Sequence, residues 1–248
     1  RDDARVAAMA LPGRRVIRFG VQAPEGAEDY GIARRDGADW LVRGEQALIA
    51  LADLPLAGRH NAMNVLAALA LCESGLGLEP KRLITGLLAF RGLPHRVQLV
   101  AERADGVRFY DDSKGTNVGA AVAALAGFDA PVVLIAGGDG KGQDFAPLAA
   151  LIAHKARAVV LMGRDAARIE AALAGVGACA DAGKGAGVRI ERATDLDDAV
   201  LRAARLAHAG DIVLLSPACA SLDMFRNYGH RAEVFVAAAR RLPEVEAR

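Results

Sequence analysis

Short apolar runs alternate with longer segments of helical apolar spacing throughout residues 93–248. The predicted strands lie at residues 97–101, 107–110, 132–136, 158–162, 188–191 and 212–215. The predicted helices lie at residues 118–125, 147–154, 166–174 and 196–207, and a last one ends at residue 242. Strands that alternate with helices in this way are typical of a parallel sheet covered on both faces. We therefore expect an α/β protein with a Rossmann-like, doubly wound C-terminal domain.

Residues 1–92 follow a different pattern. Short strands are predicted at residues 15–19, 30–33 and 40–42, and Arg35-Asp36-Gly37 supplies a turn between the last two. From Asn61 the apolar residues recur at helical spacing, and Gly75 is a suitable end for that helix. Pro80 begins a second helix that runs to about residue 88.

Gly92-Leu93-Pro94 separates the two patterns, since glycine and proline interrupt regular structure. The sequence therefore predicts one domain at residues 1–92 and a second at residues 93–248. The segment 178–187, which is rich in small residues, is expected to be a surface loop.

Composition limits the classes of partner. The chain has 248 residues, of which 53% are hydrophobic and 4% aromatic, as in α/β proteins whose cores are rich in small residues. Its 31 Lys and Arg balance 30 Asp and Glu, so no overall field attracts nucleic acid or a membrane surface. Residues 118–138 are the most apolar stretch, but Gly127, Asp129 and Pro131 interrupt it and exclude a bilayer span.

The cysteines indicate a reducing compartment. Cys72, Cys179 and Cys219 are far apart and form no C-x-x-C pair, so we expect a cytoplasmic protein. The scattered histidines have no cysteine neighbours, and no metal site is expected in this chain. Because Arg1-Asp2-Asp3 lacks a methionine, we expect the chain to start within a longer protein. Separately, we expect a monomer.

Three polar motifs follow predicted strands. They are Asp111-Asp112-Ser113-Lys114-Gly115-Thr116-Asn117, Gly137-Gly138-Asp139-Gly140-Lys141 and Ser216-Pro217-Ala218-Cys219-Ala220-Ser221-Leu222. The carboxyl ends of parallel strands share one edge of the sheet, where such folds bind ligands. Two lysines, a carboxylate and several hydroxyls at one edge suit an anionic ligand.

Common phosphate and nucleophile motifs do not explain these residues. Gly142, not Ser or Thr, follows Lys141, and Ile135 occupies the leading glycine position of a P-loop. No G-x-G-x-x-G follows a strand, and no G-x-S-x-G occurs. Lys141 is then either a point charge for a carboxylate or phosphate, or a solvated loop residue. Cys219 has no evident base and is expected to be a packing residue.

Other polar residues allow two interpretations. Thr116 and Asn117 can cap the next helix, whose free N–H groups can also bind an anion. Asp112 is harder to explain structurally, but a carboxylate that binds ribose hydroxyls would explain it. Asn61 and Asn64 share one helical face and either cap the helix and face solvent, or bind the edge of a purine.

Five motifs, in order, resemble the Mur ligase family of ATP-dependent amide-bond ligases in peptidoglycan synthesis. The first motif, Gly58-Arg59-His60-Asn61-Ala62-Met63-Asn64, is similar to the start of a helix in the family. The second, Gly92-Leu93-Pro94-His95-Arg96, is similar to the family's joint between the central and C-terminal domains. The other three are the motifs that follow the predicted strands. Asp112-Ser113-Lys114-Gly115-Thr116-Asn117 and the segment 216–228 are most similar to members that add D-glutamate. The resemblance spans essentially the whole chain.

The resemblance implies roles for individual residues. The nucleotide-binding residues would be Asn61 and Asn64 at adenine, Asp112 at ribose, and Arg96 and Lys114, both catalytic, at the phosphates. The D-glutamate-binding residues would be Thr116, Lys141, Ser221 and the backbone of Leu222 and Tyr228. The family's reaction activates the carboxylate of a nucleotide-peptide as an acyl phosphate with ATP. In the D-glutamate-adding members this substrate is UDP-N-acetylmuramoyl-L-alanine, and the D-glutamate amine attacks the acyl phosphate.

Complete family members carry further parts that do not occur in this sequence. These are an N-terminal domain for the UDP-sugar, and a P-loop with Mg²⁺ ligands in the central domain. Residues 1–92 are thus expected to be the second half of the central ATP-binding domain, with the Mg²⁺ ligands upstream, and the chain alone is expected to be inactive. One alternative is a superfamily ligase of folylpolyglutamate synthase type, but the run Ser113-Lys114-Gly115-Thr116-Asn117 argues against it. The other alternative is a non-catalytic module that binds nucleotide or acidic ligands.

Overall fold

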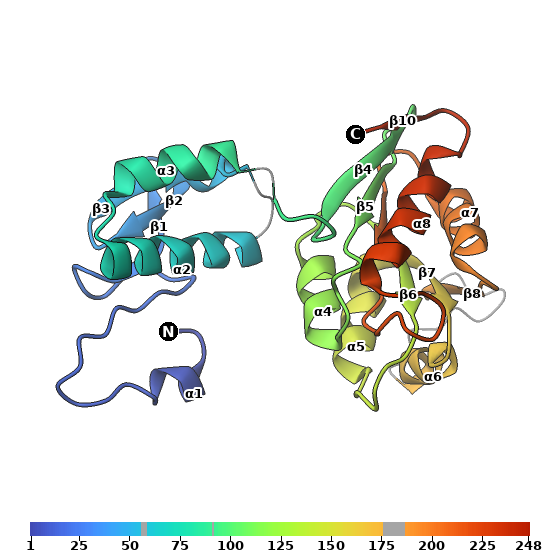
Figure 1. The fold of residues 1–248 in the computed structure, drawn as a ribbon, viewed down its shortest axis with the longest axis horizontal. Helices are drawn as coiled ribbons and strands as arrows, with labels where there is room; N and C mark the ends of the chain where they lie inside the picture. Colours follow the sequence, from blue (N-terminus) through green and yellow to red (C-terminus); the bar gives the residue numbers. More distant parts are fainter. Residues whose placement is uncertain (56–58, 91, 176–186) are drawn as a thin grey trace. The chain divides into compact units, whose positions relative to one another are not determined.

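The computed structural model describes residues 1–55, 59–90, 92–175 and 187–248, and the chain divides into two compact units, Arg1–Gly92 and Leu93–Arg248 (Figure 1). Cys179 and most of the loop expected at residues 178–187 lie outside the described residues. Within the described part of the chain, no helix has the length and apolar character that crossing a membrane requires.

The first unit packs a small antiparallel sheet against helices. Its elements are α1 (Ala4–Ala7), β1 (Tyr30–Arg35), β2 (Ala38–Arg43), β3 (Gln46–Ala50), a 3₁₀ turn (Leu51–Asp53), α2 (Arg59–Leu76) and α3 (Pro80–Ala89). The strand order is β1-β2-β3, and Asp36 and Gly37, both with positive φ, form the predicted turn. Tyr30 donates a hydrogen bond to Glu73 of α2, which also pairs with Arg43 at 3.1 Å. These contacts fix the helix on the sheet.

Three predictions for this unit need correction. Residues 15–19 form no strand, because Phe19 alone makes an isolated bridge to Tyr30, whereas the unpredicted β3 completes the sheet. α2 ends at Leu76 rather than at Gly75, since Gly77 has φ 65° and donates to the Glu73 carbonyl at 3.0 Å. Asn61 lies inside α2 and does not precede it.

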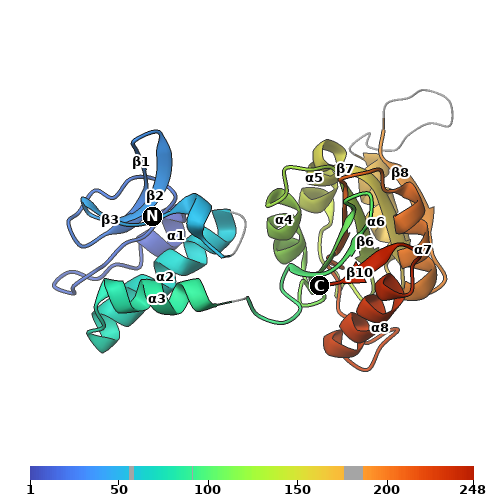
Figure 2. The same cartoon turned by 90° about the horizontal axis from the view of Figure 1, so that it is seen from above.

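The second unit contains a seven-stranded sheet, in the order β10-β4-β5-β9-β6-β7-β8. Figure 2 labels β6, β7, β8 and β10 of this sheet. Its strands are β4 (Gln98–Arg103), β5 (Arg108–Asp111), β6 (Val132–Gly137), β7 (Ala156–Met162), β8 (Arg189–Arg192), β9 (Ile212–Leu215) and β10 (Val245–Ala247). The strands from β5 to β8 in this order are parallel, whereas β4 and β10 add an antiparallel edge. The expected α/β fold is confirmed; β10 was not predicted.

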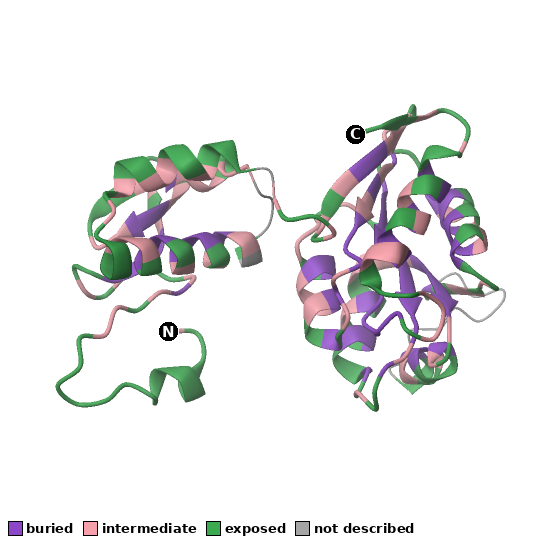
Figure 3. Ribbon diagram, viewed as in Figure 1, coloured by how far each residue is buried: buried purple, intermediate pink, exposed green. Residues whose placement is uncertain are grey.

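Helices cover both faces of this sheet. They are α4 (Val118–Ala126), α5 (Ala146–Lys155), α6 (Ala166–Gly175), α7 (Leu196–Leu206) and α8 (Tyr228–Arg240). Alternate residues of β6 face two separate cores, with Leu134 packed among residues of α4, α5 and α6 and Val133 among residues of α7 and α8. β6 is buried along its whole length (Figure 3), as expected for a central parallel strand.

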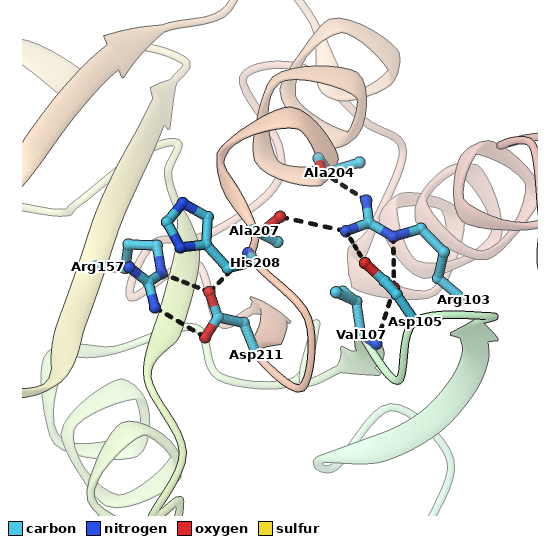
Figure 4. Close-up of polar contacts among 8 residues, drawn as sticks. All are labelled: Arg103, Asp105, Val107, Arg157, Ala204, Ala207, His208 and Asp211. Carbon is cyan, nitrogen blue, oxygen red and sulfur yellow. Dashed lines mark hydrogen bonds and ion pairs between the residues drawn. The ribbon is translucent and has the colours of Figure 1, made fainter.

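At the amino ends of the parallel strands, charged side chains satisfy one another (Figure 4). Arg157 pairs with the buried Asp211, which also accepts from the His208 backbone N–H at 2.8 Å. Arg103 donates to the carbonyls of Ala204 and Ala207 at 2.7 and 3.2 Å and so completes the end of α7. His208 lies between α7 and β9.

Candidate substrate site at the carboxyl edge

The loops after β5, β6 and β9 meet at the carboxyl edge of the sheet. Asp139 and Ala220 exchange two backbone hydrogen bonds, of 3.0 and 2.8 Å, and the Gly137 N–H donates to the Pro217 carbonyl at 2.9 Å. A Cβ on Gly137, whose φ is 123°, would lie 1.9 Å from the Met162 carbonyl oxygen, so this position requires glycine. The loop pairing fixes two of the three predicted polar motifs side by side.

Asp112 lies at the end of β5 and is buried. Its Oδ2 accepts a 2.6 Å hydrogen bond from Ser216 Oγ, and the Val97 backbone N–H also donates to the carboxylate. Burial raises the pKa of the Asp112 carboxyl to about 6, although these hydrogen bonds and the charge of Arg96 oppose the rise. Asp112 therefore has a structural role, because it joins the ends of β5 and β9 through Ser216, and its sequence context did not reveal this role. A ribose-binding role remains a prediction.

Lys114 and Tyr228 lie against each other. Lys114 Nζ is 4.0 Å from the centroid of the Tyr228 ring, which attracts it by a cation–π interaction. The Tyr228 carbonyl accepts from Ser113 Oγ at 2.8 Å, so this part of its backbone is already engaged. His95 packs edge-on against the same ring, and its Nδ1 lies 2.7 Å from the buried Asp111. The contacts hold Lys114 beside the start of α8.

Arg231 is a residue of the site that sequence reasoning missed. It is fully buried in α8, and its guanidinium donates to Ser113 Oγ at 3.0 Å, to the Ser113 carbonyl at 2.9 Å and to the Cys219 carbonyl at 3.1 Å. Burial lowers the pKa of Arg231 to about 10. Arg231 thus joins the loops after β5 and β9, a contact between residues 118 positions apart that no local pattern signals.

Lys141 is exposed and lies on a well-supported loop. Its φ is 50°, and its backbone N–H donates to Asp139 Oδ1 at 3.0 Å. The other Asp139 oxygen pairs with Arg164 at 3.0 Å, and the neighbouring Gly140 N–H donates to Asp165 at 2.7 Å. Within the part of the chain that the structure describes, the Lys141 ammonium has no ion-pair or hydrogen-bond partner and is available to an anion.

The remaining predicted residues are distributed as follows. Thr116 is half-buried and immediately precedes Asn117, whose side chain caps α4 by accepting from Ala120 N–H at 2.9 Å. Ser221 is buried, whereas the Leu222 side chain is exposed. Arg96 is exposed in the segment before β4.

Asn61 and Asn64 belong to α2 of the first unit, half-buried and exposed respectively. In the second unit, Lys114 lies against Tyr228, the charge of Arg96 acts on Asp112, and backbone pairing joins the loop that carries Lys141 to the loop that carries Ser221. Thr116 lies two residues before Val118, whose N–H donates to Gln143 of the Lys141 loop. Adenine contacts by the two asparagines remain predictions.

Cys219 is packed as predicted. Its side chain is fully buried in the core beneath α4 and α5, and burial raises the pKa of its thiol to about 12. A thiol in that state is a poor nucleophile near neutral pH. In the described ranges, no cluster of three or more His, Cys, Asp or Glu could hold a metal ion.

Comparison with known proteins agrees with this architecture. The chain matches the family described as Mur ligase, glutamate ligase domain, over residues 95–219. It is 70% identical over 247 residues to the UDP-N-acetylmuramoylalanine--D-glutamate ligase of Aromatoleum aromaticum, covering 100% of this chain and 51% of that protein. The ligase of the same name from Methylobacillus flagellatus is 55% identical over 245 residues, with coverage of 99% and 51%. The chain thus spans about half the length of these curated relatives.

Solved structures share the fold. A bifunctional folylpolyglutamate synthase/dihydrofolate synthase from Yersinia pestis matches with a TM-score of 0.57 at 22% identity, covering 94% of this chain and 49% of that one. A UDP-N-acetylmuramoyl-L-alanyl-D-glutamate--2,6-diaminopimelate ligase matches with a TM-score of 0.52 at 20% identity, covering 90% and 48%.

A Rossmann-like domain with polar loops at the carboxyl edge of its sheet is typical of α/β proteins that bind a ligand at that edge, and this chain is of that class. The chain belongs to the Mur ligase family, through its glutamate ligase domain.

Proposed function

We propose that this chain is part of a cytoplasmic, monomeric, ATP-dependent ligase that adds D-glutamate to UDP-N-acetylmuramoyl-L-alanine in peptidoglycan precursor synthesis. The observation that carries the proposal is the joining of the loops after β6 and β9. It sets Lys141, whose ammonium has no partner among the described residues, beside the Ser221 loop. The 70% identity to a D-glutamate ligase supports this choice of amino acid over a folylpolyglutamate synthase type.

The proposed reaction has two steps. The carboxylate of the nucleotide substrate attacks the γ-phosphorus of ATP, which releases ADP and forms an acyl phosphate. The D-glutamate amine then attacks the acyl carbon, so that the amide forms while phosphate and a proton leave. The protein's part is to position the reactants and neutralise their charge.

D-glutamate would bind where the carboxyl edge offers one cation and neutral donors. Lys141 would neutralise one carboxylate, with Thr116, Ser221 and the backbone of Leu222 and Tyr228 as further partners. Arg96 and Lys114 would act at the phosphates, Asp112 at the ribose and Asn61 and Asn64 at adenine. We place the Mg²⁺ ligands in a part of the protein upstream of these residues, and residues 1–92 in the central ATP-binding domain.

The test is product formation by the full-length protein that contains this chain. ADP release should require both UDP-N-acetylmuramoyl-L-alanine and D-glutamate, and mass spectrometry should detect the added glutamyl residue. L-glutamate, diaminopimelate and a folate substrate should give no more ADP than a reaction without an amino acid. Turnover with one of these in place of D-glutamate would reject the proposal.

A further inference from the structure

Gln143 lies in the loop after β6, where its carboxamide contacts segments from all three loops of the candidate site. We propose that Gln143 is a positioning residue that holds the Thr116, Lys141 and Ser221 loops in register for the amino-acid substrate. The substrate part of this inference rests on the proposed function, whereas the loop-holding part does not.

The carboxamide uses its hydrogen-bonding groups on three different partners. Gln143 Oε1 accepts from the Val118 backbone N–H at 2.9 Å. Its Nε2 donates to the Gly140 carbonyl at 2.9 Å and to the Ala218 carbonyl at 3.3 Å. A glutamine side chain has one acceptor oxygen and two donor hydrogens, and all three have a partner here.

The bond to Val118 serves a helix-start N–H that the N-cap residue Asn117 does not reach. Val118 is the first residue of α4, and an N–H at this position has no acceptor within its own helix. The N-cap side chain of Asn117 accepts from Ala120 instead, so among the described residues Gln143 is the acceptor for the buried Val118. An unpaired N–H at a buried helix start is costly, and the glutamine therefore fixes where α4 begins.

The two donated bonds hold the other loops. The Gly140 carbonyl immediately precedes Lys141, while Ala218 has φ 58°, a left-handed conformation that is strained for alanine. Thr116, Lys141 and Ser221 lie two, one and three positions from the atoms that Gln143 contacts. By contrast, among the described residues the contacts of Lys114 and Tyr228 do not involve Gln143. Its loss should therefore affect the amino acid more than the nucleotide.

The first experiment measures kinetics of the full-length protein. Gln143→Ala should raise the KM for D-glutamate about tenfold, the effect of losing bonds of ordinary strength, while the KM for ATP changes less than twofold. Gln143→Glu should be worse, because it keeps the acceptor for Val118 but turns a carboxylate toward two carbonyls. Gln46→Ala, at an exposed glutamine of β3, is the matched control and should change neither constant.

The second experiment tests the contacts without any substrate. In the 248-residue chain, Gln143→Ala should speed hydrogen exchange of the Val118 amide about tenfold relative to the Ala120 amide, which Asn117 protects. Unchanged Val118 exchange would overturn the proposal. Faster exchange with equal effects on both KM values would also overturn it, because Gln143 would then be only structural. If the wild-type enzyme does not use D-glutamate as a substrate, the proposed function is refuted, but the exchange experiment still tests whether Gln143 holds the loops.

Discussion

Ser216 Oγ donates a 2.6 Å hydrogen bond to the carboxylate of Asp112, and the two residues extend the adjacent parallel strands β9 and β5. A Cβ on Gly115 would lie 2.5 Å from the same Asp112 oxygen and 2.8 Å from Ser216 Oγ, so a side chain at this position would displace the pair. The buried pair gives Asp112 an effect on stability that is separate from any role in nucleotide binding.

The pKa of Asp112 makes the stability of the second unit depend on pH. It rises from 3.8 to about 6 on folding, so the folded state holds the proton more tightly than the unfolded state. The free energy of unfolding should therefore fall as pH rises from about 4 to about 6, and level off above that. Ionisation of Asp112 should lower the free energy of unfolding by on the order of 3 kcal/mol in total.

Thermal unfolding of the wild type and of Asp112→Asn, measured from pH 4 to pH 8, tests this prediction. The asparagine cannot ionise, and the Ser216 hydroxyl can either donate to it or accept from it. The variant should gain stability relative to the wild type as the pH rises through this window. A difference that stays constant with pH would contradict the assigned titration.

Asp112→Ala should raise the KM for ATP more than the KM for D-glutamate in the full-length enzyme. A lost charge-assisted hydrogen bond to ribose costs about 1.5–3 kcal/mol, or roughly ten- to hundredfold. Steady-state kinetics with each substrate varied in turn gives both constants, and Asp129→Ala, at an exposed aspartate, is the control. Equal changes in the two constants would mean that Asp112 supports the loops and does not bind ribose.

Lys141→Ala should weaken the use of D-glutamate by about two orders of magnitude, or ~3 kcal/mol, because a desolvated carboxylate needs a countercharge. The KM for ATP should change much less, and Lys141→Arg should restore activity only in part, since a planar fork replaces a point charge. Lys81→Ala, at an exposed lysine of α3, is the matched control. If Lys141→Ala left D-glutamate kinetics unaltered, the residue would be an ordinary solvated lysine.

Arg231→Ala should destabilise the second unit by about 3 kcal/mol, because it leaves the Ser113 and Cys219 carbonyls without this donor and removes a buried side chain. Arg231→Lys should recover little, since an ammonium cannot reproduce the three-way fork. Urea unfolding gives the free energies, with Arg205→Ala at an exposed position of α7 for comparison. A loss no larger than that of the control would show that the buried contacts contribute little.

The 248-residue chain alone should neither hydrolyse ATP nor form amide bonds. Its sequence has no P-loop, and its described residues include no cluster suited to a metal ion, so phosphate charge would not be neutralised. Phosphate release by the purified chain can be compared with a heat-treated sample of the same preparation. Release above that background would show that these residues suffice for hydrolysis.

The sequence by itself determined the helices of the second unit, its strands from β4 to β9 and the three strand-end motifs. Buried strands such as β6 are continuous apolar runs, and helices such as α7 repeat their apolar residues at helical spacing, so both patterns are local. The same reasoning was wrong at residues 15–19, because a strand exists only when a partner pairs with it. It also missed β3 and β10, short strands that pairing alone defines.

Only the tertiary structure decided which polar atoms meet. Ser216 reaches Asp112 across 104 positions, Arg231 reaches Ser113 across 118, and Gln143 reaches Ala218 across 75. The strand order places β9 between β5 and β6, and this order brings the loops together. Local propensity carries no information on strand order, because the order depends on how whole faces of helices and strands are buried against one another.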